Sequence, residues 1–174
     1  AKCGIEIDAK RPEGGHFAGN IQANVERLDY KDYTYQDIRL AGNFRRNAFD
    51  GSLQVEDPNV SLLVNGLVES KRENTVVNLS IDLEHFKPDK LHLLDKFEEP
   101  DISFALNADF VGNNIDNVVG RIDVDDLSFK TQPDSFYLKK LSVEAGTENG
   151  LRQLKIASDL INGEVKGAYS FGTI

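Results

Sequence analysis

Hydrophobic and polar residues alternate along most of this chain. Between residues 76 and 86, Val77, Leu79, Ile81 and Leu83 are apolar, and polar residues stand between them. Successive side chains of a β-strand point to opposite faces of a sheet, so this alternation is typical of a strand with one dry face and one wet face. The dry face needs a partner, which is a second layer in a globular domain and a bound ligand in a carrier.

Similar alternation predicts about ten strands along the chain. Links with turn-forming residues separate the strands, such as Asp57-Pro58-Asn59 and Asn149-Gly150, and links this short favour antiparallel hairpins. The segments are 21–30, 38–44, 49–55, 60–68, 76–86, 102–110, 122–124, 138–143, 154–156 and 165–171.

Helices are predicted at only two places. Residues 88–95 have proline in the first turn and apolar residues three apart, and the Asn-rich residues 113–119 favour a single helical turn. Two short helices cannot cover ten strands, so the sheet must cover its own apolar face. We therefore expect a mainly β fold, an antiparallel, strongly curved sheet folded as a β-taco or trough, with a closed β-sandwich or barrel as the alternative.

Five glycines occupy apolar-face positions or their neighbours, where they permit a sheet to bend: Gly42, Gly51, Gly66, Gly120 and Gly167.

A faint internal repeat divides the chain. Its matching positions are Leu28, Ile38, Leu53 and Val64 in the first copy and Leu127, Leu141, Leu154 and Val165 in the second. Stacked β units with a shared core produce such repeats, although a regular meander also gives accidental matches. We expect a lead-in segment over residues 1–16, a first β-repeat unit over 17–111, and a second, partial unit over 112–174 that continues the first.

Composition narrows the range of partners. The chain has 174 residues, 40% of them hydrophobic, and a formal net charge of −9. The hydrophobic fraction suffices for a core, while the negative charge argues against nucleic acid, which binds clustered Lys and Arg. Cys3 is the single cysteine, so the sequence contains no internal disulfide.

No pattern of catalytic or metal-binding residues emerges. His16, His85 and His92 lack the spacing of a metal pair, and Asp123 and Asp125 fall on the wet face of one strand. Nucleophile elbows and phosphate-binding glycine loops are absent as well. We therefore expect neither an enzyme nor a site for a metal or cofactor.

Residues 28–42 resemble a repeating unit of the AsmA/TamB family. The likeness continues through residues 49–53 and Asp57-Pro58-Asn59, and it is greatest to the large TamB-like proteins of Bacteroidetes. Residues 154–159 and 163–167 are similar to a further copy of the unit. The resemblance covers roughly residues 17–171 and consists of strand and turn patterns.

This resemblance implies a cellular location and a function. Such proteins span the periplasm as a β-trough, are anchored to the inner membrane by an N-terminal helix, and are associated with phospholipid transport toward the outer membrane. This chain would be an internal segment that lacks the helix. Its partners would be phospholipid acyl chains, and the full-length protein would also contact an Omp85-type outer-membrane protein through regions not present here. The alternatives are a scaffold for assembly and translocation of outer-membrane β-barrel proteins, or a closed β-sandwich for binding or adhesion.

The predicted lipid-groove lining consists of apolar residues from the alternating strands, each of which would be a core residue in a closed fold. These residues are Ile38, Leu40, Leu53, Val55, Leu62, Val64, Val77, Leu79, Ile81, Leu83, Phe104, Leu106, Leu154 and Ile156.

Overall fold

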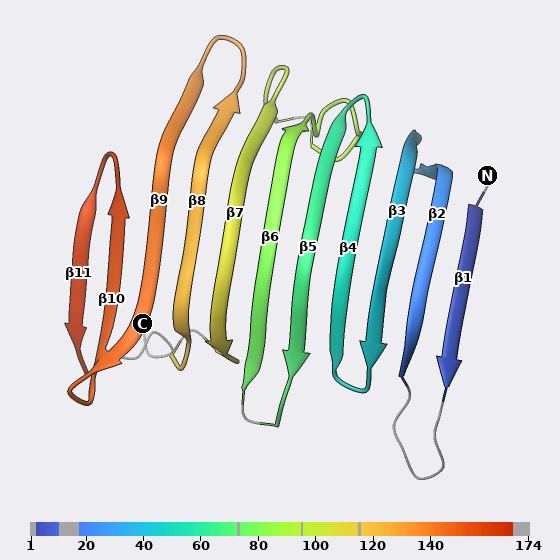
Figure 1. Ribbon diagram of the computed structural model, residues 1–174. Helices are drawn as coiled ribbons and strands as arrows, with labels where there is room; N and C mark the ends of the chain where they lie inside the picture. The colour runs from blue at the N-terminus through green and yellow to red at the C-terminus, as the bar shows by residue number, and fades with distance from the viewer. Residues whose placement is uncertain (1–2, 11–17, 73, 95, 115, 169–174) are drawn as a thin grey trace.

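The fold is a single antiparallel sheet. The computed structural model describes residues 3–10, 18–72, 74–94, 96–114 and 116–168, which form eleven strands, each paired with the next along the chain (Figure 1). The strands are β1 (Cys3–Lys10), β2 (Ala18–Tyr30), β3 (Tyr33–Arg45), β4 (Ala48–Asp57), β5 (Val60–Ser70), β6 (Thr75–Phe86), β7 (Asp101–Gly112), β8 (Val119–Lys130), β9 (Ser135–Glu148), β10 (Leu151–Ser158) and β11 (Asn162–Gly167).

The sheet is open, with β1 at one edge and β11 at the other (Figure 1). The prediction of an antiparallel, mainly β fold is confirmed. The alternative of a closed sandwich or barrel is wrong, because the two edge strands do not pair and the described residues form one sheet only. Within the described residues, no strand pairs with the outer side of β1 or of β11.

The helix predictions are wrong for the described residues. In the connection after β6, the Leu91 amide bonds the Lys87 carbonyl at 3.2 Å, but His92 then takes a positive φ of 56° and the helical path stops after one turn. In the connection after β7, the side-chain Oδ1 of Asn117 accepts from the Asn113 amide at 2.8 Å, in a turn held by side-chain bonds.

One strand was not predicted. β1 lies within the segment taken as a lead-in, although Cys3, Ile5, Ile7 and Ala9 alternate with polar or small residues. The end of the last predicted strand, residues 169–171, and His16 lie outside the described residues.

The strand register sorts the side chains into an apolar and a polar face, because residues opposite each other in an antiparallel pair share a face. One row across the sheet consists of Ile5, Ala23, Leu40, Leu53, Val64, Ile81, Leu106, Val124 and Leu141. The neighbouring row on the other face consists of Glu6, Gln22, Ala41, Ser52, Asn65, Ser80, Asn107, Asp123, Ser142, Ala157 and Asn162. We call these the apolar face and the polar face.

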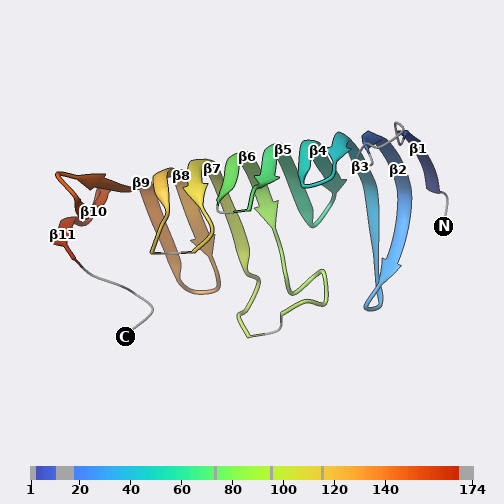
Figure 2. The same cartoon turned by 90° about the horizontal axis from the view of Figure 1, so that it is seen from below.

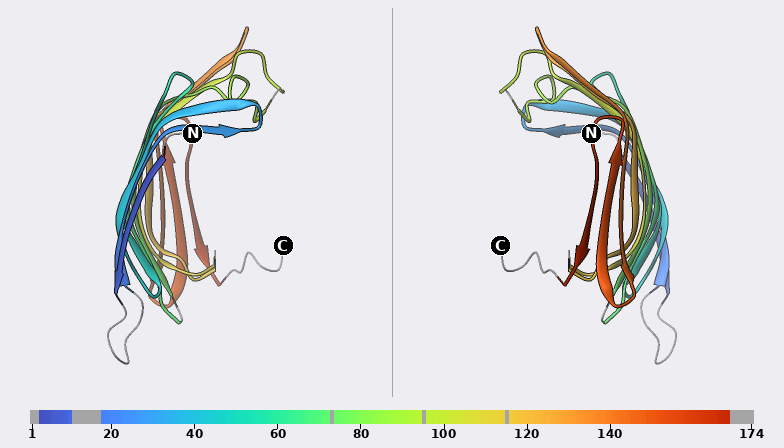
Figure 3. Two further views of the ribbon diagram at one scale, coloured as in Figure 1. Left: turned by 90° about the vertical axis from the view of Figure 1, so that its right-hand side faces the viewer. Right: turned by 90° about the vertical axis from the view of Figure 1, so that its left-hand side faces the viewer.

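The sheet is bowed, and the bend is sharpest near one end of the strands (Figure 3). Asp37 in β3 and Asp126 in β8 have positive φ angles of 45° and 52°. The register also shifts between Leu83 and Phe86 in β6, as well as near the start of β5 and of β7. Bulges of this kind bend strands, so their alignment explains why neighbouring strands turn in the same direction.

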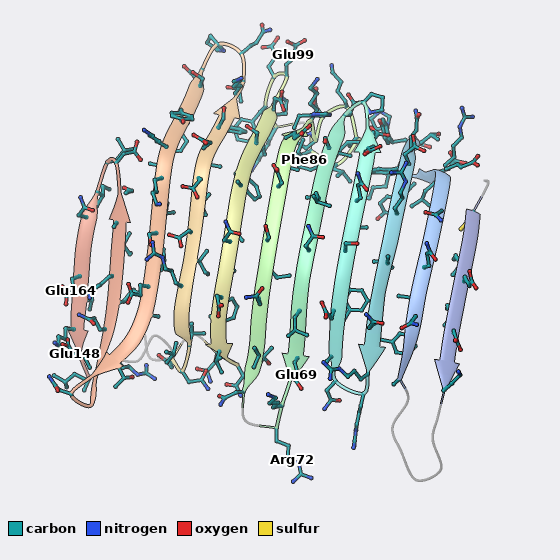
Figure 4. All side chains as sticks on the ribbon, viewed as in Figure 1. Glu69, Arg72, Phe86, Glu99, Glu148 and Glu164 are labelled. Carbon is teal, nitrogen blue, oxygen red and sulfur yellow. The ribbon has the colours of Figure 1, made fainter. Side chains whose placement is uncertain are left out.

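The connection between β6 and β7 lies on the concave side of the sheet (Figures 2 and 3). Its Leu91 is fully buried and packs with Val55, Val60 and Leu83, while Pro100 is also fully buried. Phe86 lies at the end of β6 where this connection begins (Figure 4). Because Leu91 contacts apolar-face residues, the apolar face is the concave one.

Three of the predicted glycines are neighbours in one row of the apolar face, between Ile21 and Leu79. Gly42 pairs with Gly51, and Gly51 pairs with Gly66. A Cβ on Gly51 would lie 2.7 Å from the Gly42 Cα and 2.9 Å from the Phe49 ring. The absence of side chains here therefore lets the Phe49 ring lie against the backbone of β3 and β4.

We predict that Gly51→Ala lowers the free energy of unfolding by about 1–3 kcal/mol, because the added methyl overlaps backbone and the Phe49 ring. The matched control is Gly146→Ala in β9, where a Cβ meets no atom within 4 Å. Urea unfolding followed by circular dichroism measures both. Equal stability of the two variants would contradict the packing of the glycine row.

Candidate functional site: an uncovered apolar face

The fourteen predicted lining residues all lie on the apolar face. Register places them in four adjacent rows across the sheet. Val55, Val77 and Leu83 are buried, Ile156 is 39% exposed, and the other ten are half-buried. The structure thus brings the predicted residues together on one surface.

This surface also contains apolar residues that the predicted set did not include. Phe110, Ile122, Val124, Leu141 and Val143 share rows with it and extend it across β7, β8 and β9. The same alternation along each strand marks these residues in the sequence. The apolar surface is therefore continuous from β3 to β10.

The upper end of the apolar face is covered by the connection after β6. Leu91 packs against Val55 and Leu83, with Tyr35 and Phe104 around them, and Pro88 of the same connection is buried. Away from this end, the described residues leave most of the face uncovered. A sheet face of this size is normally buried against another element, so the uncovered part is the candidate site.

A cavity of about 720 Å³ indents the apolar face near its other end. Phe110, Ile122, Val143 and Leu154 form its apolar walls, together with Val118 from the turn after β7. Arg152 of β10 reaches Asp116 of the same turn, with 3.0 Å between Nη1 and Oδ1. This ion pair joins the turn to β10 across the cavity.

A buried carboxylate fixes the covered end. Asp57 is 4% exposed and accepts hydrogen bonds from the Tyr33 hydroxyl, from the Gln36 amide at 3.0 Å and from the Asn59 amide at 2.8 Å. The Asn59 side-chain amide donates to the Tyr33 oxygen at 3.0 Å. Tyr33 belongs to β3 and Asp57 ends β4, so the cluster ties the start of one strand to the next turn.

This cluster has a structural role. Burial raises the pKa of the Tyr33 hydroxyl above its ordinary value of 10.0, and the bond to Asp57 raises it further. His85 Nε2 lies 3.3 Å from the Asp57 carbonyl oxygen, and His92 Nδ1 lies 3.1 Å from the Lys31 carbonyl oxygen. Sequence reasoning singled out Asp57-Pro58-Asn59 as a turn, but not its bonds to β3.

The polar face is held by short-range pairs among its own side chains. Arg121 binds Asp123 through two hydrogen bonds of 2.6 and 2.8 Å. The hydrogen bond from Arg121 is the main reason that the pKa of Asp123 lies below its ordinary range. Asn78 donates to Asp109 at 3.1 Å across neighbouring strands. These pairs are typical of a solvated face, as predicted for Asp123.

Within the described residues, His, Cys, Asp and Glu form no group of three suited to hold a metal ion. The described part of the chain contains no helix that is long and apolar enough to cross a membrane.

Comparison with known proteins finds no protein-family model, no curated protein and no solved structure that matches this chain.

We predict that Asp57→Asn lowers the free energy of unfolding by about 1–3 kcal/mol, because the amide cannot accept every bond that the carboxylate accepts in this buried position. Asp50→Asn, in the same strand but on the exposed polar face, is the control and should change stability by less than about 0.5 kcal/mol. Thermal and urea unfolding measure both variants. Unchanged stability of Asp57→Asn would contradict the stabilising role of the Asp57 hydrogen bonds.

We also predict a pH effect from Tyr33. Its pKa is raised in the folded chain, so the neutral hydroxyl is favoured there and the associated stability is lost as the pH rises through that pKa. Above about pH 10, the stability of the wild type should therefore fall more steeply than that of Tyr33→Phe. Urea unfolding of both proteins at pH 8 and pH 11 tests this, and parallel slopes would contradict it.

Proposed function

We propose that this chain is a segment of a periplasmic intermembrane conduit whose apolar β-face shields phospholipid acyl chains on their way to the outer membrane. The observation that carries the proposal is the open, one-layer sheet with an apolar concave face and a polar convex face. In this proposal the bowed sheet is one stretch of a β-taco, or trough.

The energetic argument follows from the uncovered surface. Each Å² of apolar surface removed from water contributes about 25 cal/mol, and roughly 0.8 kcal/mol per methylene group. Acyl chains lying along the row that contains Leu40, Val64 and Ile81 would gain this energy while the headgroups stay in water. Transfer of this kind needs no bond chemistry, in keeping with an expected function that is not enzymatic.

The face offers few polar groups to fix the orientation of a ligand. From β3 to β7, the rows that cross its centre consist of Val, Leu, Ile, Ala, Phe and Gly. Pockets gain specificity from a few placed polar groups, so a face without them would accept acyl chains with little selectivity. Low selectivity suits a conduit for bulk lipid.

The resemblance to the AsmA/TamB family supports the same proposal. Tyr33, Asp57 and Asn59 belong to the stretches that carry the resemblance, and in the fold they form the hydrogen-bonded cluster at the covered end. We propose membership of this family, a periplasmic location, and a longer protein that is anchored to the inner membrane by an N-terminal helix. An Omp85-type partner would act through other regions of that protein.

A second candidate function is favoured by the open edges. Ile5 and Ile7 in β1 are 62% and 59% exposed, and Val165 in β11 is 53% exposed. An edge strand with unpaired backbone can add a strand from another chain. This arrangement suits a scaffold for outer-membrane β-barrel proteins, which would bind along the edges and not along the concave face.

Photocrosslinking separates the two functions. With a photoreactive amino acid at position 79 or 81 in cells, we expect phospholipid adducts, because Leu79 and Ile81 lie in the middle of the apolar face. Positions 78 and 80, exposed on the polar face, are the matched controls and should give few adducts. Mass spectrometry identifies the product. Adducts at 78 and 80 but none at 79 and 81 would contradict the conduit, whereas nascent barrel proteins bound at Ile5 would favour the scaffold.

A further inference from the structure

The cavity on the apolar face differs from the rest of that face. It has a volume of about 720 Å³, which lies within the range of roughly 300–1,000 Å³ typical of ligand pockets. The turn after β7 forms one wall through Asn117 and Val118, and β7 to β10 form the remainder. An acyl chain on the open face is shielded on one side only, whereas this wall gives it a second side.

The described residues that line the cavity place its two charges on opposite walls. The positive charge is Arg152, whose side chain is 33% exposed, and the negative charge is Asp116, 25% exposed. Partial exposure of both side chains puts them at the rim, where headgroup and solvent meet. The rest of the lining is mostly apolar and includes Phe110, Ile122 and Leu154.

The rim favours an anion. Both side chains of the ion pair reach solvent, so an incoming phosphate or carboxylate can share the guanidinium with the Asp116 carboxylate or replace it. The Arg guanidinium presents several donors in a fork that fits such groups. Asn117 is already engaged by the Asn113 and Asn114 amides at 2.8 and 3.1 Å, so it offers little to a polar ligand.

We propose that this cavity is a lipid subsite, which holds one acyl chain of an anionic lipid with the chain on the apolar walls and the phosphate or carboxylate at Arg152. The inference rests on the proposed function and deepens it, because it introduces selectivity for anionic headgroups at one point of an otherwise unselective face. The headgroup would compete with Asp116 for the guanidinium, so the ion pair acts as a gate to the subsite.

Binding of hexadecanoic acid to the full chain tests the subsite, with hexadecanol as its uncharged analogue. Ala145→Trp fills the cavity and should weaken binding of both probes about tenfold, the equivalent of two lost methylene contacts. Arg152→Gln should weaken the acid about three- to fivefold and leave the alcohol unchanged. Asp116→Asn should strengthen binding of the acid, because it removes the competing carboxylate.

Ala157→Trp is the control, since Ala157 is an exposed residue of the same strand as Leu154 but lies on the polar face. It should bind both probes as the wild type does. Circular dichroism checks the fold of each variant, and Arg152→Gln at the exposed rim keeps the test valid if Ala145→Trp misfolds.

The outcomes distinguish failure of the lipid subsite from failure of the proposed conduit. Unchanged binding in Ala145→Trp and Arg152→Gln, together with lipid adducts at positions 79 and 81, would overturn the subsite and leave the conduit in place. Displacement of hexadecanoic acid by inorganic phosphate alone, with equal affinity for short and long acids, would assign a free-anion site and also overturn the subsite. Absence of both binding and adducts would overturn the conduit as well.

Discussion

The rest of the structure depends on one constraint, namely that an alternating sequence in a one-layer sheet cannot cover its own apolar side. Every strand with the period of Val77, Leu79 and Ile81 presents a dry face and a wet face. A second layer would bury the dry face, yet the described residues supply only the connection after β6 at one end and the turn after β7 beside the cavity. Most of the apolar face is therefore left uncovered by the described residues.

At the covered end, the connection after β6 buries part of the apolar face. Leu91 is buried against Val55 and Leu83, and next to them Asp57 is bonded by Tyr33 and Asn59. A buried carboxylate is costly unless it is fully hydrogen-bonded, so these bonds are needed for the turn to lie against apolar side chains. The result is a fixed end from which the bowed strands extend to the uncovered part.

Much of this architecture could be predicted from the sequence, because alternation is a local signal. It placed most strands and put all predicted lining residues on one face. It could not decide between an open sheet and a closed one, since both place Leu40 and Ile81 on the same side. The helix at residues 88–95 failed because His92 adopts a left-handed conformation, which no residue pattern in that segment indicated.

The sequence could not predict the hydrogen bonds of Asp57 or the cavity, because both depend on contacts between residues far apart in the chain. Tyr33 and Asp57 are 24 residues apart, and only the register of β3 against β4 and β5 brings them together. The cavity likewise needs the turn after β7 to meet β10, which Asp116 and Arg152 do across 36 residues. Strand period predicts which face a residue occupies, but it does not predict which turn folds over that face.

The most direct measurement of the central claim is native mass spectrometry of the chain purified without detergent from the periplasm of a diderm bacterium. If the apolar face is open to lipid, the chain should carry phospholipid, and Leu79→Asp combined with Ile81→Asp should remove that lipid while the circular dichroism spectrum stays that of a β-sheet. A lipid-free wild type whose apolar face is buried in a dimer would contradict the account.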